Sequence, residues 1–281
     1  MDIIIPVSKN YMEQLQMTLP FVKKNLSFDR IIVVTNKMNF PGVADDGVVY
    51  VDENKLLDFT YSDVEELIVT RGGDKSRTGW YFQQFLKIGY AKVCRDTHYL
   101  VWDADTIPLK NIEFLNGDKM LFNMKNEHHE PYFETIKTLF NHKITPFTRK
   151  KYSSFISEGM IINTEIMRNM ISDIEGNSDI LGESFWEKII NAVPIAELNR
   201  SGFSEFETYG SYLLTNYPAL FQERPLKTER YGYTMFGGTL SDEEFRKTGL
   251  DTVSYEEWDK KSKLKLLRRL YIKIRRRLYD L

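Results

Sequence analysis

Two aspartates that follow an apolar segment are the residues in this chain best suited to chemistry. Residues 99–102 are Tyr-Leu-Val-Trp, Asp103 and Asp105 come next, and Pro108 then interrupts the pattern. We expect a buried strand whose carboxyl end carries both carboxylates, and ligands bind at that end of the strands in open α/β sheets. Two hard oxygen ligands at this spacing suit Mg²⁺ or Mn²⁺. The structural alternative is a strand end whose aspartates only cap the following turn.

The segments before this pair predict the sheet that must position it. Asp2–Val7, Arg30–Asn36 and Val48–Val51 are apolar or β-branched runs typical of buried strands, and Tyr11–Lys24 has helical spacing of its apolar residues. Strands that alternate with helices predict an α/β fold with a mostly parallel, Rossmann-type sheet flanked by helices. No Gly-x-Gly-x-x-Gly follows the first strand, so the dinucleotide-binding fingerprint is absent.

Further elements are predicted along the rest of the chain. Apolar spacing predicts helices over Asp63–Thr70, Gly79–Val93, Thr164–Ser172, Gly182–Ala192 and Phe203–Tyr217, and strands over Lys119–Asn123 and Met160–Ile162. Ser204 with Glu207, and Ser254 with Glu257, have the spacing of capping boxes that begin helices. The second pair predicts a last helix that starts at Ser254.

Length and composition exclude several classes of protein. The chain of 281 residues is 42% hydrophobic, enough for the core of one α/β domain. Its single cysteine, Cys94, excludes a disulfide framework and a cysteine zinc cluster. The N-terminal residues lack the basic region and long apolar run of a signal peptide, and no segment approaches the ~20 apolar residues of a membrane span.

Charge is distributed unevenly, with a strongly basic segment near the C-terminus. Residues 260–277 hold ten Lys and Arg residues and no acid, whereas the rest of the chain has 28 basic and 40 acidic residues. Apolar side chains at 267, 270, 274 and 278 form one stripe, so this segment is predicted to be a basic amphipathic helix that binds an anionic membrane surface. A solvated helix packed on the body is the alternative, and nucleic-acid binding lacks a supporting motif. We therefore divide the chain into a domain at 1–250 and a C-terminal helix at 251–281.

Six sequence landmarks occur in a fixed order along the chain. They are Ile-Ile-Ile-Pro-Val at 3–7, Val-Thr-Asn at 34–36, Gly-Trp-Tyr-Phe-Gln-Gln-Phe-Leu-Lys at 79–87, Trp-Asp-Ala-Asp at 102–105, Ser-Glu-Gly-Met at 157–160 and Ser-Glu-Phe-Glu-Thr-Tyr-Gly at 204–210. In this order and spacing, residues 1–240 resemble GT-A-fold glycosyltransferases of the kind found in bacterial gene clusters for capsule, O-antigen and other surface polysaccharides.

The resemblance implies roles for particular residues. Asp103 and Asp105 match the Asp-x-Asp pair that binds a divalent metal, Mn²⁺ or Mg²⁺, which bridges the diphosphate of a nucleotide-sugar donor. A transferase that inverts the sugar also needs a carboxylate base for the acceptor hydroxyl. The residues that the resemblance assigns to the donor are Pro6, Val7, Thr35, Asn36, Gln83, Lys87, Trp102 and Ala104; those assigned to catalysis are Glu205, Glu207 and Glu158; those assigned to the acceptor are Gly159 and Tyr209.

The resemblance thus implies a hexosyltransferase-like enzyme with a UDP-sugar as donor and a lipid-linked or growing surface glycan as acceptor. It would act at the cytoplasmic face of the cell membrane, held there by residues 260–277. The third protein ligand of the metal stays open, because no histidine follows His142. His128 and His129 are candidate metal ligands, with surface residues as the structural alternative. Backbone amides of residues 231–238 could instead bind the diphosphate. The structural alternative for Glu207 is a helix-capping role. The structural alternative for Lys87 is a solvated lysine on a helix surface.

Two other functions are compatible with the same residues. In haloacid-dehalogenase phosphatases an apolar strand also ends in Asp-x-Asp, and the first aspartate, here Asp103, would be the nucleophile. Against this, Ile107 replaces the usual Thr or Val, the motif lies 100 residues into the chain, and Gly117-Asp118 lacks the second acid of the downstream motif. The third possibility is a catalytically silent sugar-binding scaffold on the same fold.

Overall fold

The computed structural model describes residues 1–42, 46–144, 153–237, 243, 245, 247–260 and 270. The chain forms two compact units, each built from segments far apart in the sequence. Unit 1 comprises Met1–Lys9, Phe28–Trp102 and Phe114–Arg224, and unit 2 comprises Asn10–Ser27, Asp103–Glu113 and Pro225–Leu281.

A five-stranded sheet is the centre of unit 1. Its order is β10-β4-β1-β2-β3, with β1 at Asp2–Pro6, β2 at Arg30–Thr35, β3 at Val48–Asp52, β4 at His98–Trp102 and β10 at Gly159–Asn163. The pairs β4-β1, β1-β2 and β2-β3 are parallel, and only β10 runs antiparallel to its neighbour β4. The four consecutive isoleucine and valine residues of β2, at positions 31–34, are all buried, as expected for a strand covered on both faces.

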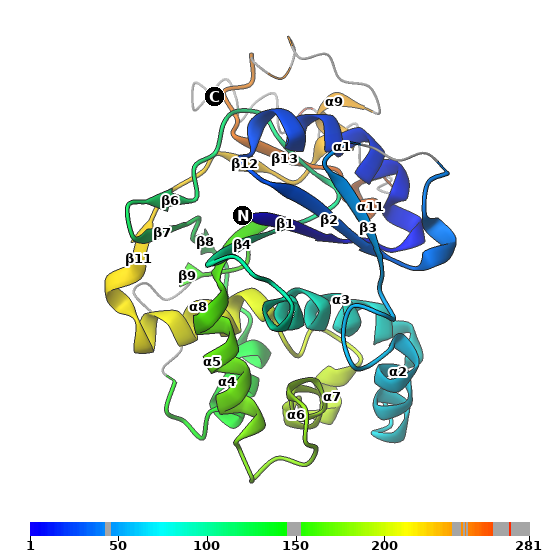
Figure 1. Ribbon diagram of the computed structural model, residues 1–281, viewed down its shortest axis with the longest axis vertical. Coiled ribbons are helices and arrows are strands. Elements are labelled where there is room, and N and C mark those ends of the chain that lie inside the picture. The colour runs from blue at the N-terminus through cyan, green and yellow to red at the C-terminus, as the bar shows by residue number, and fades with distance from the viewer. Residues whose placement is uncertain are drawn as a thin grey trace. The chain divides into compact units, whose positions relative to one another are not determined.

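Seven helices of unit 1 lie together on one side of this sheet (Figure 1). They are α2 (Tyr61–Thr70), α3 (Thr78–Gly89), α4 (Glu130–Leu139), α5 (Thr164–Glu175), α6 (Phe185–Ala192), α7 (Ile195–Leu198) and α8 (Glu205–Asn216). Phe59 joins α3 to α6, because its ring packs against Phe82 of α3 and against Phe185 and Trp186 of α6, at centroid distances of 6.0, 5.9 and 5.2 Å. The predicted fold class, α/β with a mostly parallel sheet and helices, is confirmed.

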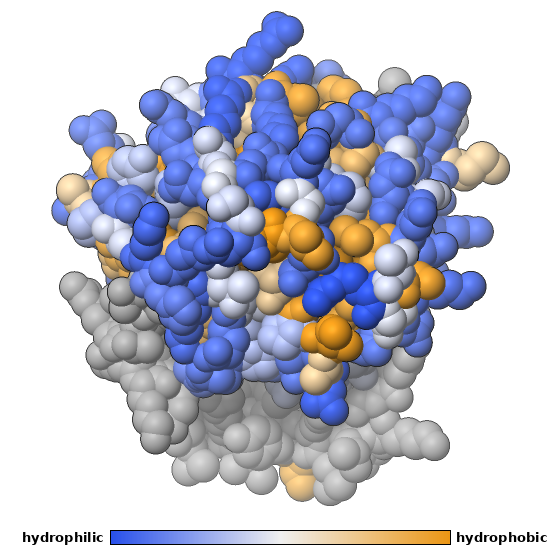
Figure 2. Space-filling model, turned by 90° about the horizontal axis from the view of Figure 1, so that it is seen from below, coloured by the Kyte–Doolittle hydropathy of each residue, from blue (hydrophilic) through white to orange (hydrophobic). Residues whose placement is uncertain are grey.

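Smaller elements complete unit 1. One three-stranded sheet contains β11 (Phe221–Glu223), β7 (Lys119–Phe122) and β6 (Leu115–Asn116), and β8 (Lys125–Asn126) pairs with β9 (Ser153–Ser154). Single 3-10 turns of unit 1 occur at η2 (Lys37–Asn39), η3 (Lys75–Arg77), η4 (Tyr90–Lys92) and η5 (Pro218–Leu220), and η1 (Lys9–Tyr11) lies where the chain passes from unit 1 to unit 2. Figure 2, which looks at the molecule from below Figure 1, shows a mainly hydrophilic face with small hydrophobic areas between the polar side chains.

Unit 2 is organised around a second three-stranded sheet. Its order is β12 (Thr228–Glu229), β13 (Thr252–Ser254) and β5 (Thr106–Pro108), and the helices among its described residues are α1 (Met12–Asn25), α9 (Gly232–Phe236) and α11 (Glu257–Lys260). Its buried core contains Ile107, Phe245, Val253 and Tyr255, with Met17 and Phe21 of α1 packed against it. This core joins three distant parts of the sequence.

Several predicted boundaries differ from the observed ones. The helix predicted at Gly79–Val93 ends at Gly89 and continues only as a 3-10 turn, and the one predicted at Gly182–Ala192 begins at Phe185, after a capping box of Ser184 and Glu187. The capping box predicted at Ser254 is wrong. Ser254 lies in β13, where its hydroxyl shares a 2.7 Å hydrogen bond with Thr106, so the helix begins at Glu257.

The basic segment lies almost entirely outside the described residues. Of residues 260–277 only Lys260 and Leu270 are described, so the amphipathic helix and the domain division at residue 250 stay predictions. Within the described part of the chain, no helix combines the length and apolar character needed to cross a membrane.

Candidate functional site: a carboxylate cluster in unit 2

Asp103 and Asp105 lie on a tight turn between β4 and β5. The amide of Thr106 donates to the carbonyl of Asp103 at 3.2 Å, so the backbone closes this turn. The hydroxyl of Thr18 on α1 donates to the carbonyl of Ala104 at 2.8 Å and holds the turn from the other side. Ala104, predicted to contact the donor, is therefore the point at which α1 is fixed to the turn.

Strand pairing brings a third carboxylate to this turn. β13 runs antiparallel to β5, and the amide of Tyr255 donates to the carbonyl of Asp105 at 2.8 Å. Glu256 is the next residue, and its carboxylate accepts a 2.8 Å hydrogen bond from Nε of Arg230. We call Asp103, Asp105 and Glu256 the carboxylate cluster.

The three carboxylates repel one another when ionised. Burial raises the pKa of the Asp105 carboxyl, and the negative charges of Glu256 and Asp103 raise it further, to about 8. Burial likewise raises the pKa of Glu256, although Arg230 opposes the shift. Burial and the nearby charge of Asp105 also raise the pKa of the Tyr11 hydroxyl, to about 12.

A divalent cation fits this donor set. The cluster offers only hard oxygen ligands, which Mg²⁺ and Mn²⁺ prefer. A cation would also remove the mutual repulsion that raises the pKa of Asp105. Glu256 is a third carboxylate close enough to Asp103 and Asp105 to interact with them electrostatically, and the sequence analysis did not name it. Its signal in the sequence is weak, because only the pairing of β5 with β13 brings Glu256 to the turn.

In unit 1, four residues predicted to bind the nucleotide lie at the carboxyl ends of β1 and β2. Pro6 is the last residue of β1, and Val7 follows it with its amide bonded to the carbonyl of Val34 at 2.8 Å. Thr35 ends β2, and Asn36 caps the 3-10 turn that follows, where its side chain accepts from the amide of Met38. These residues therefore share one edge of the sheet.

Helix α3 carries two more of the predicted donor residues of unit 1. The side-chain amide of Gln83 donates to the carbonyl of Pro6 at 3.2 Å, so this helix is fixed to the end of β1. Lys87, one turn later, is buried and donates to the carboxylate of Glu205 at 2.8 Å. The structure thus brings together Lys87, predicted to bind the donor, and Glu205, predicted to be the base. The sequence did not predict this ion pair.

Glu207 and Tyr209, on helix α8, have contacts typical of core residues. The hydroxyl of Ser154 and the amide of Phe155 donate to one carboxylate oxygen of Glu207 at 2.6 and 3.0 Å. Burial raises the pKa of Glu207 despite these two bonds. Tyr209 is fully buried, and its hydroxyl accepts from the amide of Asn163 at 2.8 Å. Half of the predicted capping box is present, since Ser204 accepts from the Glu207 amide.

Of the remaining predicted residues, Gly159 lies beside the end of β4, and His128 and His129 precede α4. Gly159 pairs with Trp102, and a Cβ atom at Gly159 would lie 2.3 Å from the indole, so the glycine leaves room for that ring. Glu158, which precedes it, is buried and bound to Lys125 at 3.0 Å. His128 contacts Glu130 at 2.8 Å, and His129 contacts the carbonyl of Ser201 at 2.7 Å.

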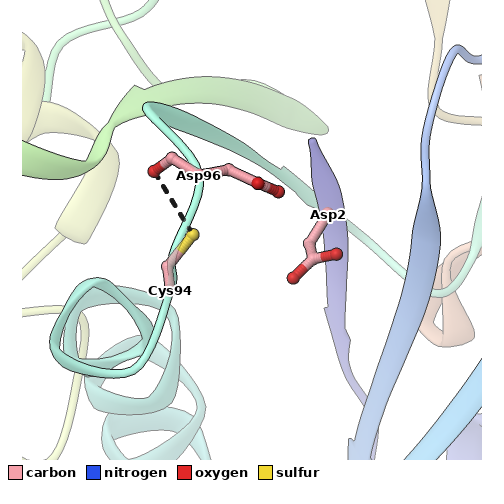
Figure 3. Close-up of side chains that lie close together, drawn as sticks. All are labelled: Asp2, Cys94 and Asp96. Carbon is pink, nitrogen blue, oxygen red and sulfur yellow. Dashed lines mark hydrogen bonds between the residues drawn. The ribbon is translucent and has the colours of Figure 1, made fainter.

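A second group of possible metal ligands, Asp2, Cys94 and Asp96, lies in unit 1 (Figure 3). Their ligand atoms lie within 4.8 Å of one another. The carboxylate of Asp2 already accepts from Arg30 at 2.7 Å and from the hydroxyl of Tyr90 at 2.6 Å. The group also lies at the amino-terminal edge of the parallel strands, opposite the edge where such sheets bind ligands. Its contacts indicate an anchor for the start of β1.

The fold and these residues define an α/β protein with an acidic turn directly after a central parallel strand. Residues 11–236 match the model of a family of unknown function, DUF6492, and the chain belongs to that family. Comparison with curated proteins gave no match.

Solved glycosyltransferase structures resemble the chain at low identity. A mouse xyloside xylosyltransferase 1 in its apo form has 12% identity and a TM-score of 0.48, with 92% of this chain and 98% of that chain covered. The galactosyltransferase LgtC, bound to donor and acceptor sugar analogues, has 12% identity and a TM-score of 0.40, with 91% and 87% covered. The bifunctional glycosyltransferase WbbM, in its apo form, has 10% identity and a TM-score of 0.46, with 90% and 45% covered. All three TM-scores are below 0.5.

Proposed function

We propose that the protein is a metal-dependent glycosyltransferase that moves a sugar from a nucleotide-sugar donor, a UDP-sugar, to a lipid-linked or growing surface glycan. The carboxylate cluster carries this proposal. Asp103 and Asp105, on the turn directly after β4, and Glu256, just after β13, offer carboxylate oxygens that suit a hard cation. When bound there, the cation would neutralise charge on the leaving nucleoside diphosphate.

The residues of unit 1 support the same reaction. Pro6, Val7, Thr35 and Asn36 lie at the edge of the sheet where ligands bind in open α/β folds, and they are proposed to contact the base and ribose. Glu205 is proposed to take the proton of the acceptor hydroxyl if the reaction inverts the sugar. The ammonium of Lys87, 2.8 Å away, holds the Glu205 carboxylate in place.

Glu158 is the second candidate for the base. It is buried like Glu205 and has its own lysine, Lys125, at 3.0 Å. We propose Glu205 first, because the side-chain oxygen of Gln84 accepts a 3.1 Å hydrogen bond from the backbone amide of Glu205 and so orients the start of its helix. Loss of turnover in Glu205→Gln with retained donor binding would support this order, and the same result in Glu158→Gln alone would reverse it.

The basic segment is proposed to hold the enzyme at the cytoplasmic face of the membrane. Residues 260–277 bring ten cations to a chain whose other residues are acidic overall. Anionic lipid attracts such segments by about 1 kcal/mol for each basic residue near the surface. A lipid-linked acceptor would be presented at that surface.

Thermal stabilisation tests the metal and donor together. UDP with Mn²⁺ at 100 times its dissociation constant stabilises the native state by about 2.7 kcal/mol, which raises the melting temperature by roughly 5–10 °C. We expect EDTA or Asp105→Asn to abolish this shift. Asp118→Asn is the matched control, because Asp118 is an exposed turn aspartate outside the cluster. An undiminished shift in Asp105→Asn would refute the metal site.

A further inference from the structure

Trp258 is a large aromatic residue that is exposed beside the carboxylate cluster. Its side chain is 43% exposed, and it is the second residue of the short helix α11. Exposure of an indole leaves a large apolar area in water, which costs free energy that burial would recover. The exposed part of this indole is available to a ligand.

The residues on both sides of Trp258 are held by hydrogen bonds to other helices. The side chain of Gln14 donates to Glu257 at 2.6 Å, which joins α11 to α1. Asp259 is fully buried and accepts from the amide of Thr234 at 2.9 Å and from its hydroxyl, which joins α11 to α9. Trp258 is thus the exposed residue between two anchored neighbours.

The ring of Trp258 is oriented as well. Its side chain hydrogen bonds to Glu256, a member of the carboxylate cluster. The ring of Tyr231 meets the indole edge to face at a centroid distance of 5.1 Å and an interplanar angle of 87°. Arg230, next to Tyr231, binds the same glutamate. An indole held by a hydrogen bond and an aromatic neighbour presents a rigid face at little entropic cost.

We propose that Trp258 is a sugar-stacking residue, whose indole packs against the C–H face of a pyranose ring beside the carboxylate cluster. The carboxylates can accept hydrogen bonds from the hydroxyls of the sugar ring, and the Arg230 guanidinium can donate hydrogen bonds to them. The indole covers the apolar face of the same ring. The ring belongs to the donor or the acceptor, so this inference rests on the proposed transferase function. A nucleobase is less compatible with the position, because its carbonyl oxygens would face the acidic cluster.

Three variants of one position test the proposal. Trp258→Phe and Trp258→Ala both remove the indole N–H near Glu256, and they differ in whether an aromatic face remains. The probes are methyl glycosides of glucose, galactose, N-acetylglucosamine and xylose, studied by saturation-transfer NMR with Mn²⁺ present. We expect saturation on one face of the ring in the wild type and in Trp258→Phe, and binding about tenfold weaker in Trp258→Ala.

UDP without a sugar separates the possible outcomes. If Trp258→Ala and Trp258→Phe bind the glycosides equally well, the stacking role is refuted while the transferase proposal stands. If the two variants differ in their affinity for UDP itself, the indole binds the base, and the sugar assignment is wrong. If the wild type binds neither UDP with Mn²⁺ nor any glycoside, the proposed function fails together with the inference.

Discussion

The buried ion pair between Lys87 and Glu205 gives a stability prediction that can be worked out from the structure. The two side chains are 7% and 9% exposed, the N–O distance is 2.8 Å, and Lys87 also lies over the ring of Phe206 at 4.8 Å. Removal of one partner from such a pair leaves a buried charge without its counter-charge, which costs about 3–5 kcal/mol. Replacement of both charges by neutral groups of similar size is often nearly neutral.

We therefore expect Lys87→Met and Glu205→Gln each to lower the free energy of unfolding by about 3–5 kcal/mol. The double variant should lose much less than the sum, with a coupling energy of about 2–4 kcal/mol. Each kcal/mol corresponds to roughly 2–4 °C in melting temperature for a chain of this size class. A coupling energy of this size would show that each charge is tolerated in the buried site because the other neutralises it.

Urea unfolding measures this coupling. Far-UV circular dichroism follows the whole chain, and tryptophan fluorescence follows mainly unit 1, which contains Trp80, Trp102 and Trp186. Lys247 and Glu243 are the matched control pair, since they have the same 2.8 Å distance but side chains 72% and 79% exposed. We expect little or no coupling there, because water screens the pair. Additive costs at Lys87 and Glu205, or single costs below about 1 kcal/mol, would refute the reasoning.

Three further predictions concern the packing at Gly159, the buried carboxyl of Glu207 and the basic C-terminal segment. Gly159→Ala places a Cβ atom 2.3 Å from the indole of Trp102 and should lower the free energy of unfolding by about 1–3 kcal/mol, which thermal melts can measure. Gly42→Ala is the control, because no atom lies within 4 Å of the added Cβ, and it should leave the stability unchanged. Equal melting temperatures of the two variants would contradict the packing at Gly159. Because burial raises the pKa of Glu207 above its ordinary 4.5, the stability that its protonated form contributes is lost as pH rises from 4.5 through the raised value. Glu207→Gln should lack this loss, and its melting temperature relative to the wild type should rise over that interval; a constant difference would argue against the shift. Deletion of residues 260–281 should release the protein from sedimenting anionic vesicles, and unchanged sedimentation would exclude the membrane role of that segment.

The sequence alone predicted the elements whose signals are local. The apolar runs at 2–6, 30–35 and 98–102 are strands of one sheet, and Asp103 and Asp105 follow the last of them. Helices α3 and α8 begin within two residues of their predicted starts, because apolar spacing and the Ser204 cap are encoded in neighbouring residues. These features need no knowledge of distant parts of the chain.

Tertiary structure alone decided how the charged residues are partnered. Lys87 and Glu205 are 118 residues apart, and the contact of Thr106 with Ser254 that aligns Glu256 spans 148. No local pattern encodes such pairs, because a lysine or glutamate on a helix has the same sequence signal whether it meets water or a buried counter-charge. The same holds for Ser254, which the spacing predicted as a helix cap. The pairing of β5 with β13 uses its hydroxyl and backbone in a sheet, since burial of Ile107 and Val253 in one core outweighs the local preference for a cap.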